Sequence, residues 1–198
     1  MIGAWRGVAL EVAAWDGASA EVDLSVACMF SRELSSGGPA GGLLHLDQAL
    51  NGALTRLRTE AHFRAEMMET LLIPQPHEVA AKAVLLVGLG EPEAWTATIS
   101  GRAVAAALRV AVQLDARTAA FAPSVLDSGL TSGAAIPEAT MQGVLDAIDT
   151  QHQLVMLGLA EPLSLRRWVF DVGAPRFDTA VTAFSEALGR LRPSGEQS

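Results

Sequence analysis

The chain contains 198 residues, half of them apolar, and its 22 acidic side chains outnumber its 14 basic ones to give a formal charge of −8. A chain of this length fits one domain and can bury roughly 70% of its unfolded surface, so its core needs no metal or disulfide. Nucleic acids and anionic membranes attract positive charge, and the net negative charge therefore argues against either as a general partner.

Cysteine content and hydropathy indicate the compartment. Cys28 is the only cysteine, so no intrachain disulfide can form, and its position in the apolar run 24–30 predicts a buried thiol. Acidic residues interrupt the first apolar stretch, and no apolar run approaches the ~20 residues that span a bilayer. We therefore expect a cytoplasmic protein without a signal peptide or a membrane segment.

The first predicted elements are two strands and a helix. The apolar segments 5–15 and 22–30 are short and rich in Val, Leu and Ala, which favours strands. The glycine- and proline-rich stretch 35–42 predicts a loop. Leucines then recur at three- and four-residue steps and predict one amphipathic helix, with Asp47 on its polar side. These leucines are Leu43, Leu46, Leu50, Leu54 and Leu57.

Helices and strands largely alternate along the rest of the chain. This alternation predicts an α/β fold with three αβα layers and a central mixed sheet of about six strands. We expect one domain over residues 1–192 and a disordered tail at 193–198. The further strands are expected at 69–73, 82–88, 118–122 and 167–172, and the further helices after Pro92 to about 114, from about Pro137 onward, and at 177–191.

Motifs of well-known reactions are missing from the sequence. It contains no His-Glu-x-x-His pattern, no G-x-S-x-G elbow and no phosphate loop that ends in Gly-Lys-Ser/Thr. Its four histidines do not show the spacing of metal ligands. Gly88-Leu89-Gly90 is only half of a dinucleotide fingerprint, and a tight turn after a strand explains it better. We therefore predict no catalytic residue, no metal site and no cofactor.

Two glycine-rich loops, 37–42 and 128–133, each lie between a predicted strand and a predicted helix. In an open α/β sheet, loops at the carboxyl ends of strands line the usual ligand crevice. The N-termini of the helices that follow would favour an anion such as phosphate. The two loops could together hold a diphosphate, or both could be simple connections; the sequence leaves these alternatives open.

Four motifs occur in a fixed order, at 22–26 (Val-Asp-Leu-Ser-Val), 46–54 (Leu-Asp-Gln-Ala-Leu-Asn-Gly-Ala-Leu), 69–74 (Glu-Thr-Leu-Leu-Ile-Pro) and 84–90 (Val-Leu-Leu-Val-Gly-Leu-Gly). This order resembles the N-terminal domain of the leucyl (cytosol) aminopeptidase family. The resemblance implies a fold like that of macro domains, which bind ADP-ribose. It also implies that the two-metal peptidase site belongs to a separate C-terminal domain, whose motif, similar to Asn-Thr-Asp-Ala-Glu-Gly-Arg, does not occur in this sequence.

The likeness to macro domains implies four candidate crevice residues. Asp23 precedes a strand, as does the Asp that contacts adenine in macro domains. Gly38 lies in a glycine-rich stretch that resembles the ribose loop, and Ser132 and Gly133 resemble the loop that binds the diphosphate. Where macro domains usually carry Asn after the second strand, this sequence has Cys-Met-Phe-Ser at 28–31.

The resemblance predicts a stand-alone, non-catalytic accessory or assembly domain that contacts another copy of itself or a catalytic aminopeptidase partner. On this interpretation the chain alone does not hydrolyse peptides. One alternative is a small-molecule binding domain that holds a nucleotide or ADP-ribose-like ligand through Asp23, Gly38, Ser132 and Gly133. Another is that the chain is half of a split or truncated metallo-aminopeptidase.

Overall fold

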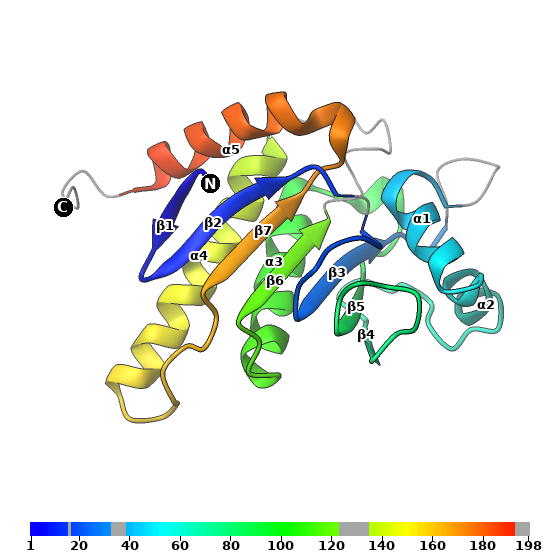
Figure 1. Ribbon diagram of the computed structural model, residues 1–198, viewed down its shortest axis with the longest axis horizontal. Helices are drawn as coiled ribbons and strands as arrows, with labels where there is room; N and C mark the ends of the chain where they lie inside the picture. Colours follow the sequence, from blue (N-terminus) through cyan, green and yellow to red (C-terminus); the bar gives the residue numbers. More distant parts are fainter. Residues whose placement is uncertain (16, 33–38, 123–134, 193–198) are drawn as a thin grey trace.

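The computed structural model describes residues 1–15, 17–32, 39–122 and 135–192. These residues build a mixed sheet of seven strands in the order β1-β2-β7-β6-β3-β5-β4 (Figure 1). The five inner strands are parallel, and the edge strands β1 and β4 are antiparallel to their neighbours. The strands span Gly3–Trp5 (β1), Val8–Ala13 (β2), Leu24–Met29 (β3), Thr70–Pro74 (β4), Ala83–Gly88 (β5), Thr118–Ala122 (β6) and Arg167–Asp171 (β7).

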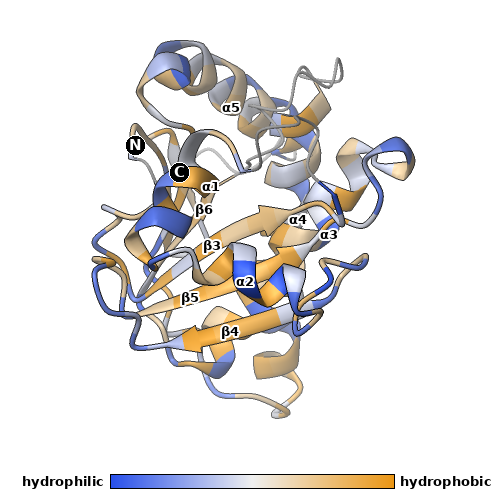
Figure 2. Ribbon diagram, turned by 90° about the vertical axis from the view of Figure 1, so that its right-hand side faces the viewer, coloured by the Kyte–Doolittle hydropathy of each residue, from blue (hydrophilic) through white to orange (hydrophobic). Residues whose placement is uncertain are grey.

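Helices cover both faces of the sheet, which confirms the predicted α/β architecture. Helices α3, α4 and α5 share one large apolar core with one face, whereas α1 and α2 pack on the other face beside β3, β5 and β4. Figure 2 shows that the strands are largely apolar, while α2 carries several polar residues. The helices span Gly41–Ala49 (α1), Ala53–Thr59 (α2), Ala97–Gln113 (α3), Ala135–Met156 (α4) and Phe177–Leu191 (α5), with 3₁₀ turns at Pro92–Ala94 (η1) and Ala174–Arg176 (η3).

The first predicted strand is in fact a hairpin, which is why the sheet has seven strands where the sequence predicted about six. Trp5 at the end of β1 pairs with Val8 at the start of β2, so the two residues between them form the turn. Arg6 and Gly7 both adopt positive φ angles, 43° and 82°. Two-residue hairpin turns need this backbone conformation, because it matches the twist of the flanking strands.

The single helix predicted from the leucine pattern is divided into α1 and α2. Asn51 and Gly52 have φ angles of 54° and 74°, which no helix can accommodate. The side chain of Asp47 bonds across the break: its Oδ1 accepts from the backbone N–H of Leu54 at 2.8 Å, and its Oδ2 accepts from the hydroxyl of Thr55. Asp47 is therefore buried, at 6% exposure, and its predicted place on a polar helix side is wrong.

Helices α3 and α4 lie in backbone contact behind the parallel strands. A Cβ at Gly101 would lie 2.4 Å from the carbonyl oxygen of Ala139, and a Cβ at Gly143 would lie 2.3 Å from that of Gly101. Any larger side chain at either position would force the helices apart. This contact holds together the layer on which β3, β5 and β6 rest.

The centre of the sheet confirms the predicted burial of Cys28 but not the tight turn predicted at residues 88–90. Cys28 on β3 is 2% exposed, and burial raises the pKa of its thiol to about 12. Gly88 is the last residue of β5, and Leu89 N–H donates to the carbonyl of Met29, so the pairing with β3 continues beyond the strand and no tight turn follows it. A Cβ at Gly88 would lie 2.1 Å from the carbonyl oxygen of Glu66, and Gly90 has a φ of 73°, so these glycines allow a close backbone approach.

Candidate functional site

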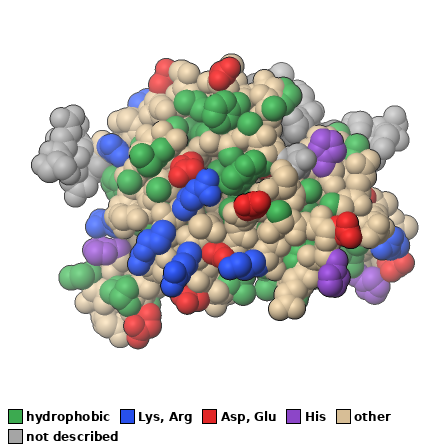
Figure 3. Space-filling view, in the orientation of Figure 1, with side chains coloured by type: hydrophobic (Ala, Val, Ile, Leu, Met, Phe, Trp, Pro, Cys, Tyr) green, Lys and Arg blue, Asp and Glu red, His purple; other side chains and the backbone are tan. Residues whose placement is uncertain are grey.

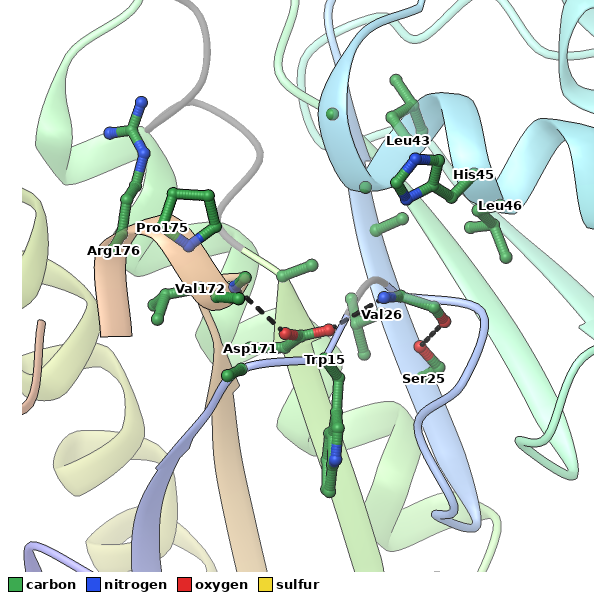
Figure 4. Close-up of a pocket in the computed structure, with 18 residues that line it drawn as sticks. Trp15, Ser25, Val26, Leu43, His45, Leu46, Asp171, Val172, Pro175 and Arg176 are labelled. Carbon is green, nitrogen blue, oxygen red and sulfur yellow. Dashed lines mark hydrogen bonds between the residues drawn. The ribbon is translucent and has the colours of Figure 1, made fainter. Parts of the chain in front are cut away.

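A pocket of about 310 Å³ lies at the carboxyl ends of β2, β6 and β7, beside the N-terminal end of α1 (Figure 4). Its floor includes Ala27 and Ala122, which are paired in register on β3 and β6. Asp171, the last residue of β7, lies on the same side of the sheet (Figure 4). The described lining comprises Ala14, Trp15, Gly17, Ser25, Val26, Ala27, Gly41, Gly42, Leu43, His45, Leu46, Ala122, Asp171, Val172, Gly173, Ala174, Pro175 and Arg176.

The topology of the sheet explains why the pocket forms there. From β3 the chain continues outward through α1, α2 and β4 to β5, and then returns past β3 to β6 and β7 on the other side. The direction of the connections therefore reverses between β3 and β6. In open α/β sheets, such a reversal leaves a crevice at the carboxyl ends of the strands, where ligands bind.

Asp171 connects two of the loops that shape the pocket. Asp171 is buried, at 5% exposure, and its Oδ2 accepts a hydrogen bond from the N–H of Gly17 at 2.9 Å. Its Oδ1 accepts from the N–H of Gly173 at 3.4 Å. The hydroxyl of Ser25 donates to the carbonyl of Gly17 at 3.3 Å. The backbone N–H and the carbonyl of Gly17 are therefore both hydrogen-bonded to side chains.

The N-terminal end of α1 gives the pocket a partial positive charge. Gly41 and Gly42, the first residues of the helix, line the pocket. Ala40 provides no side-chain cap, and the first turn carries no acidic residue. The first N–H groups of a helix lack intrahelical partners and carry the positive end of its dipole. Figure 4 shows His45 of α1 and Arg176 of η3 on opposite sides of the pocket.

The structure places only part of the predicted crevice. Gly38, Ser132 and Gly133 lie outside the described residues, and their contact with a ligand stays a prediction. Gly41 and Gly42, at the end of the first predicted loop, do line the pocket. The predicted tail 193–198 also lies outside the described ranges.

Asp23 directly precedes β3 and lies two positions before Ser25 of the pocket lining. It is not itself among the described lining residues. Its Oδ2 accepts from the N–H groups of Arg117 at 2.8 Å and Thr118 at 2.9 Å, and its Oδ1 lies 2.7 Å from Lys82 Nζ. The Lys82 ammonium, followed by these backbone donors, outweighs desolvation and lowers the pKa of Asp23 to about 2. Asp23 therefore joins the starts of β3, β5 and β6.

Several charged side chains elsewhere lie in pairs of opposite sign. Arg167 lies 2.9 Å from Glu11, and Arg6 pairs with Asp149. On the face shown in Figure 3, basic and acidic side chains are interspersed. Within the described ranges there is no group of three or more His, Cys, Asp or Glu that could hold a metal ion. The helices in this part of the chain are also too short or too polar to cross a membrane.

Comparison with known proteins decides the family. The profile of the cytosol aminopeptidase family, N-terminal domain, matches residues 28–156. This chain belongs to that family. A probable cytosol aminopeptidase of Acidobacterium capsulatum is 37% identical over 84 residues, which cover 42% of this chain and 17% of the relative. The chain spans only 14–20% of the length of the curated relatives that it matches.

Solved structures confirm the macro-domain-like fold of this cytosol aminopeptidase domain. A mutant of tomato leucine aminopeptidase superposes with a TM-score of 0.62 at 19% identity, over 92% of this chain and 36% of the other. A Trypanosoma brucei macrodomain in complex with ADP-ribose superposes with a TM-score of 0.64 at 16% identity, over 93% of this chain and 70% of the other. At such low identity these likenesses establish the fold.

Several residues that line the pocket of this aminopeptidase-family domain were not predicted from the sequence. Asp171 and Gly17 are 154 positions apart, and no local pattern connects them. One signal was available: a carboxylate ends an otherwise apolar run at the carboxyl end of a predicted parallel strand, just before Gly173. Ser25 and His45 carried no comparable signal, because each lies within an element that reads as core or as helix.

Proposed function

We propose that these residues form a non-catalytic accessory domain of a cytosol aminopeptidase, which acts through contact with another copy or with a catalytic partner. The match to the family's N-terminal domain over residues 28–156 carries this proposal. Two-metal hydrolysis requires side chains that converge on both ions, and the described residues provide no such group.

An exposed apolar cluster at the end of α4 supports a contact role. Met156, Leu157 and Leu159 are 70%, 69% and 71% exposed. The turn that carries them is well bonded: Leu159 N–H donates to the carbonyl of Leu154 at 2.8 Å, and Gly158 has a φ of 69°. Clustered large apolar side chains in water mark sites of protein contact. Figure 1 shows that this end of α4 projects beyond the sheet.

Light scattering tests this proposal with two samples. The chain is measured alone across a dilution series, and it is mixed with the full-length Acidobacterium capsulatum relative. We expect a concentration-dependent rise in mass in at least one sample, and a loss of that rise when Met156, Leu157 and Leu159 are all replaced by Ser. Met67→Ser is the matched control, since Met67 is 45% exposed elsewhere. A strict monomer in both samples would contradict a contact role.

The pocket favours a second candidate function, which is binding of a nucleotide or ADP-ribose-like ligand. It lies at the reversal point of the sheet, where ligands bind in this class of fold. A structural neighbour, the Trypanosoma brucei macrodomain, was solved with ADP-ribose. Saturating ADP-ribose should therefore raise the melting temperature of the domain, because a ligand that binds the folded state stabilises it. An unchanged melting temperature would remove this candidate.

The third possibility is that peptidase activity belongs to a longer protein of which this domain is one part. The curated relatives are several times longer than the segments that match, and their remaining length has room for a catalytic domain. Leucine anilide would then be cleaved only when such a catalytic part is supplied. Hydrolysis by these residues alone would contradict both this possibility and the accessory role.

A further inference from the structure

The two edges of the sheet are protected to different degrees. At β1, the Arg192 guanidinium donates to the carbonyl of Ala4 at 2.9 Å, and the side chains of Arg192 and Leu188 lie against Gly3. At the other edge, β4 pairs only with β5, and Figure 2 shows it as the outermost strand. An uncovered edge presents unpaired N–H and C=O groups, to which another strand can bind.

The hydrogen-bond pattern shows which groups of β4 point outward. Gln75 N–H donates to the carbonyl of Lys82, and the carbonyl of Glu69 accepts from Gly88 N–H, so residues 69, 71, 73 and 75 bond towards β5. In an antiparallel ladder the residues between them point their N–H and C=O groups away from that neighbour. Within the described ranges no hydrogen bond reaches these outward groups. The residues that carry them are Thr70, Leu72 and Pro74.

The side chains of β4 suit pairing with another strand. Residues 70–74 include no charged side chain, whereas natural proteins commonly block an edge with charge. Leu72 is 36% exposed, and Leu71 and Ile73 are only partly buried against the core under α1 and α2. Pro74 lacks an N–H, so at this edge it can only accept a hydrogen bond, which limits the registers in which a second strand can pair.

The strand is complementary to itself in the register that overlaps all five residues. When two copies of β4 run antiparallel in this register, Leu72 faces Leu72 of the second copy and Thr70 faces Pro74. The outward N–H groups of Thr70 and Leu72 in both copies then each meet a carbonyl, and the missing N–H of Pro74 leaves no donor unpaired. Leu71 lies opposite Ile73, and apolar cross-strand pairs of this kind stabilise sheets.

We propose that β4 binds β4 of a second copy of this chain and extends the sheet across a two-fold axis. The chain carries a formal charge of −8, so two copies repel each other least where they meet through an uncharged edge. This inference rests on the contact function proposed above. It assigns β4 to the contact between copies and leaves the apolar cluster of α4, which lies on the other side of the molecule, to a catalytic partner (Figure 1).

A covalent trap is the appropriate test, because one pair of strands covers less than the ~1,200 Å² of a stable interface and binds weakly. Leu72→Cys provides the trap, since the two Cα atoms would lie about 5.5 Å apart, a distance that a disulfide spans. The native Cys28 is buried and does not compete. Thr70→Cys is the matched control: it lies on the same exposed edge, but its counterpart would be offset by four residues, roughly 13 Å.

The purified full chains are oxidised with copper phenanthroline, and disulfide-linked dimer is followed on non-reducing gels. At about 0.1 mM chain we expect Leu72→Cys to form dimer at least about tenfold faster than Thr70→Cys, because pairing holds its two thiols together. Adding Thr70→Pro to Leu72→Cys removes an outward donor from each copy and no bond to β5, so the rate should fall several-fold. Melting temperatures establish that each variant folds, and the comparison with Thr70→Cys does not depend on Thr70→Pro.

A further variant separates this inference from the function on which it rests. Replacing Met156, Leu157 and Leu159 by Ser in Leu72→Cys should leave the cross-linking rate unchanged; a large fall would show that copies meet through α4 and would overturn the inference. Equal rates for Leu72→Cys and Thr70→Cys would also overturn it, and a rise in mass by light scattering would then leave the contact function standing. Equal rates together with a strict monomer in both light-scattering samples would reject the contact function and the inference together.

Discussion

Replacing Asp23 with Asn should destabilise the domain by about 2 kcal/mol at neutral pH. The carboxylate binds the backbone N–H groups of Arg117 and Thr118 and lies 2.7 Å from Lys82 Nζ. A pKa lowered from 3.8 to about 2 corresponds to roughly 2.5 kcal/mol in favour of the ionised form, at about 1.36 kcal/mol per unit. The Lys82 side chain is 79% exposed, so solvent screens its share and the expected loss is somewhat smaller.

The pH dependence follows from the direction of the shift. Because the folded-state pKa of Asp23 is depressed, its stabilisation is fully present above about pH 4 and is lost as the pH falls towards 2. Urea unfolding of the wild type and Asp23→Asn at several pH values should therefore show a difference that shrinks below pH 4. Lys82→Met is the control and should cost less than about 1 kcal/mol, because it removes only the exposed partner.

Two results would refute this reasoning. One is a stability difference between the wild type and Asp23→Asn that stays constant from pH 7 to pH 2. The other is an Asp23→Asn variant that unfolds like the wild type but no longer binds ADP-ribose, because Asp23 would then serve a ligand and not the junction of three strands.

Three further substitutions or treatments have defined outcomes. Gly101→Ala should lower the free energy of unfolding by about 1–3 kcal/mol, since its Cβ would lie 2.4 Å from a backbone oxygen of α4, whereas Gly189→Ala, with nothing within 4 Å, should be neutral or slightly stabilising in the same urea titration. Asp47→Ala should cost about 1–2 kcal/mol by thermal melting, since it leaves the start of α2 uncapped. Cys28 should react with a thiol reagent at pH 8 only after denaturation, because burial raises its pKa to about 12; rapid labelling of the folded protein would contradict its burial.

Short-range patterns in the sequence were sufficient to predict most of the fold. Apolar runs and leucine spacing predicted most strands and helices, because burial on a sheet or helix face repeats over a few residues. The division between α1 and α2 was missed because it depends on the left-handed backbone of Asn51 and Gly52 and on the cap from Asp47. The leucine spacing continues across this break, and the local sign of it is the Asn51-Gly52 pair, a dipeptide typical of turns.

The pocket was harder to predict because long-range register builds it. Ala27 and Ala122 meet through the pairing of β3 with β6, and Asp171 reaches Gly17 across 154 positions. The glycine-rich loop predicted the position of Gly41 and Gly42 beside a crevice, because loops at the carboxyl ends of strands line the crevice of an open α/β sheet. The resemblance to macro domains indicated Asp23, whose described contacts are with the starts of neighbouring strands.

The most direct test of the central claim is a leucine anilide hydrolysis assay on the purified chain with manganese or zinc added. If the domain acts by contact and not by catalysis, the rate should equal that of buffer containing the same metal. Turnover that co-elutes with the domain, and that a chelator abolishes, would contradict the account.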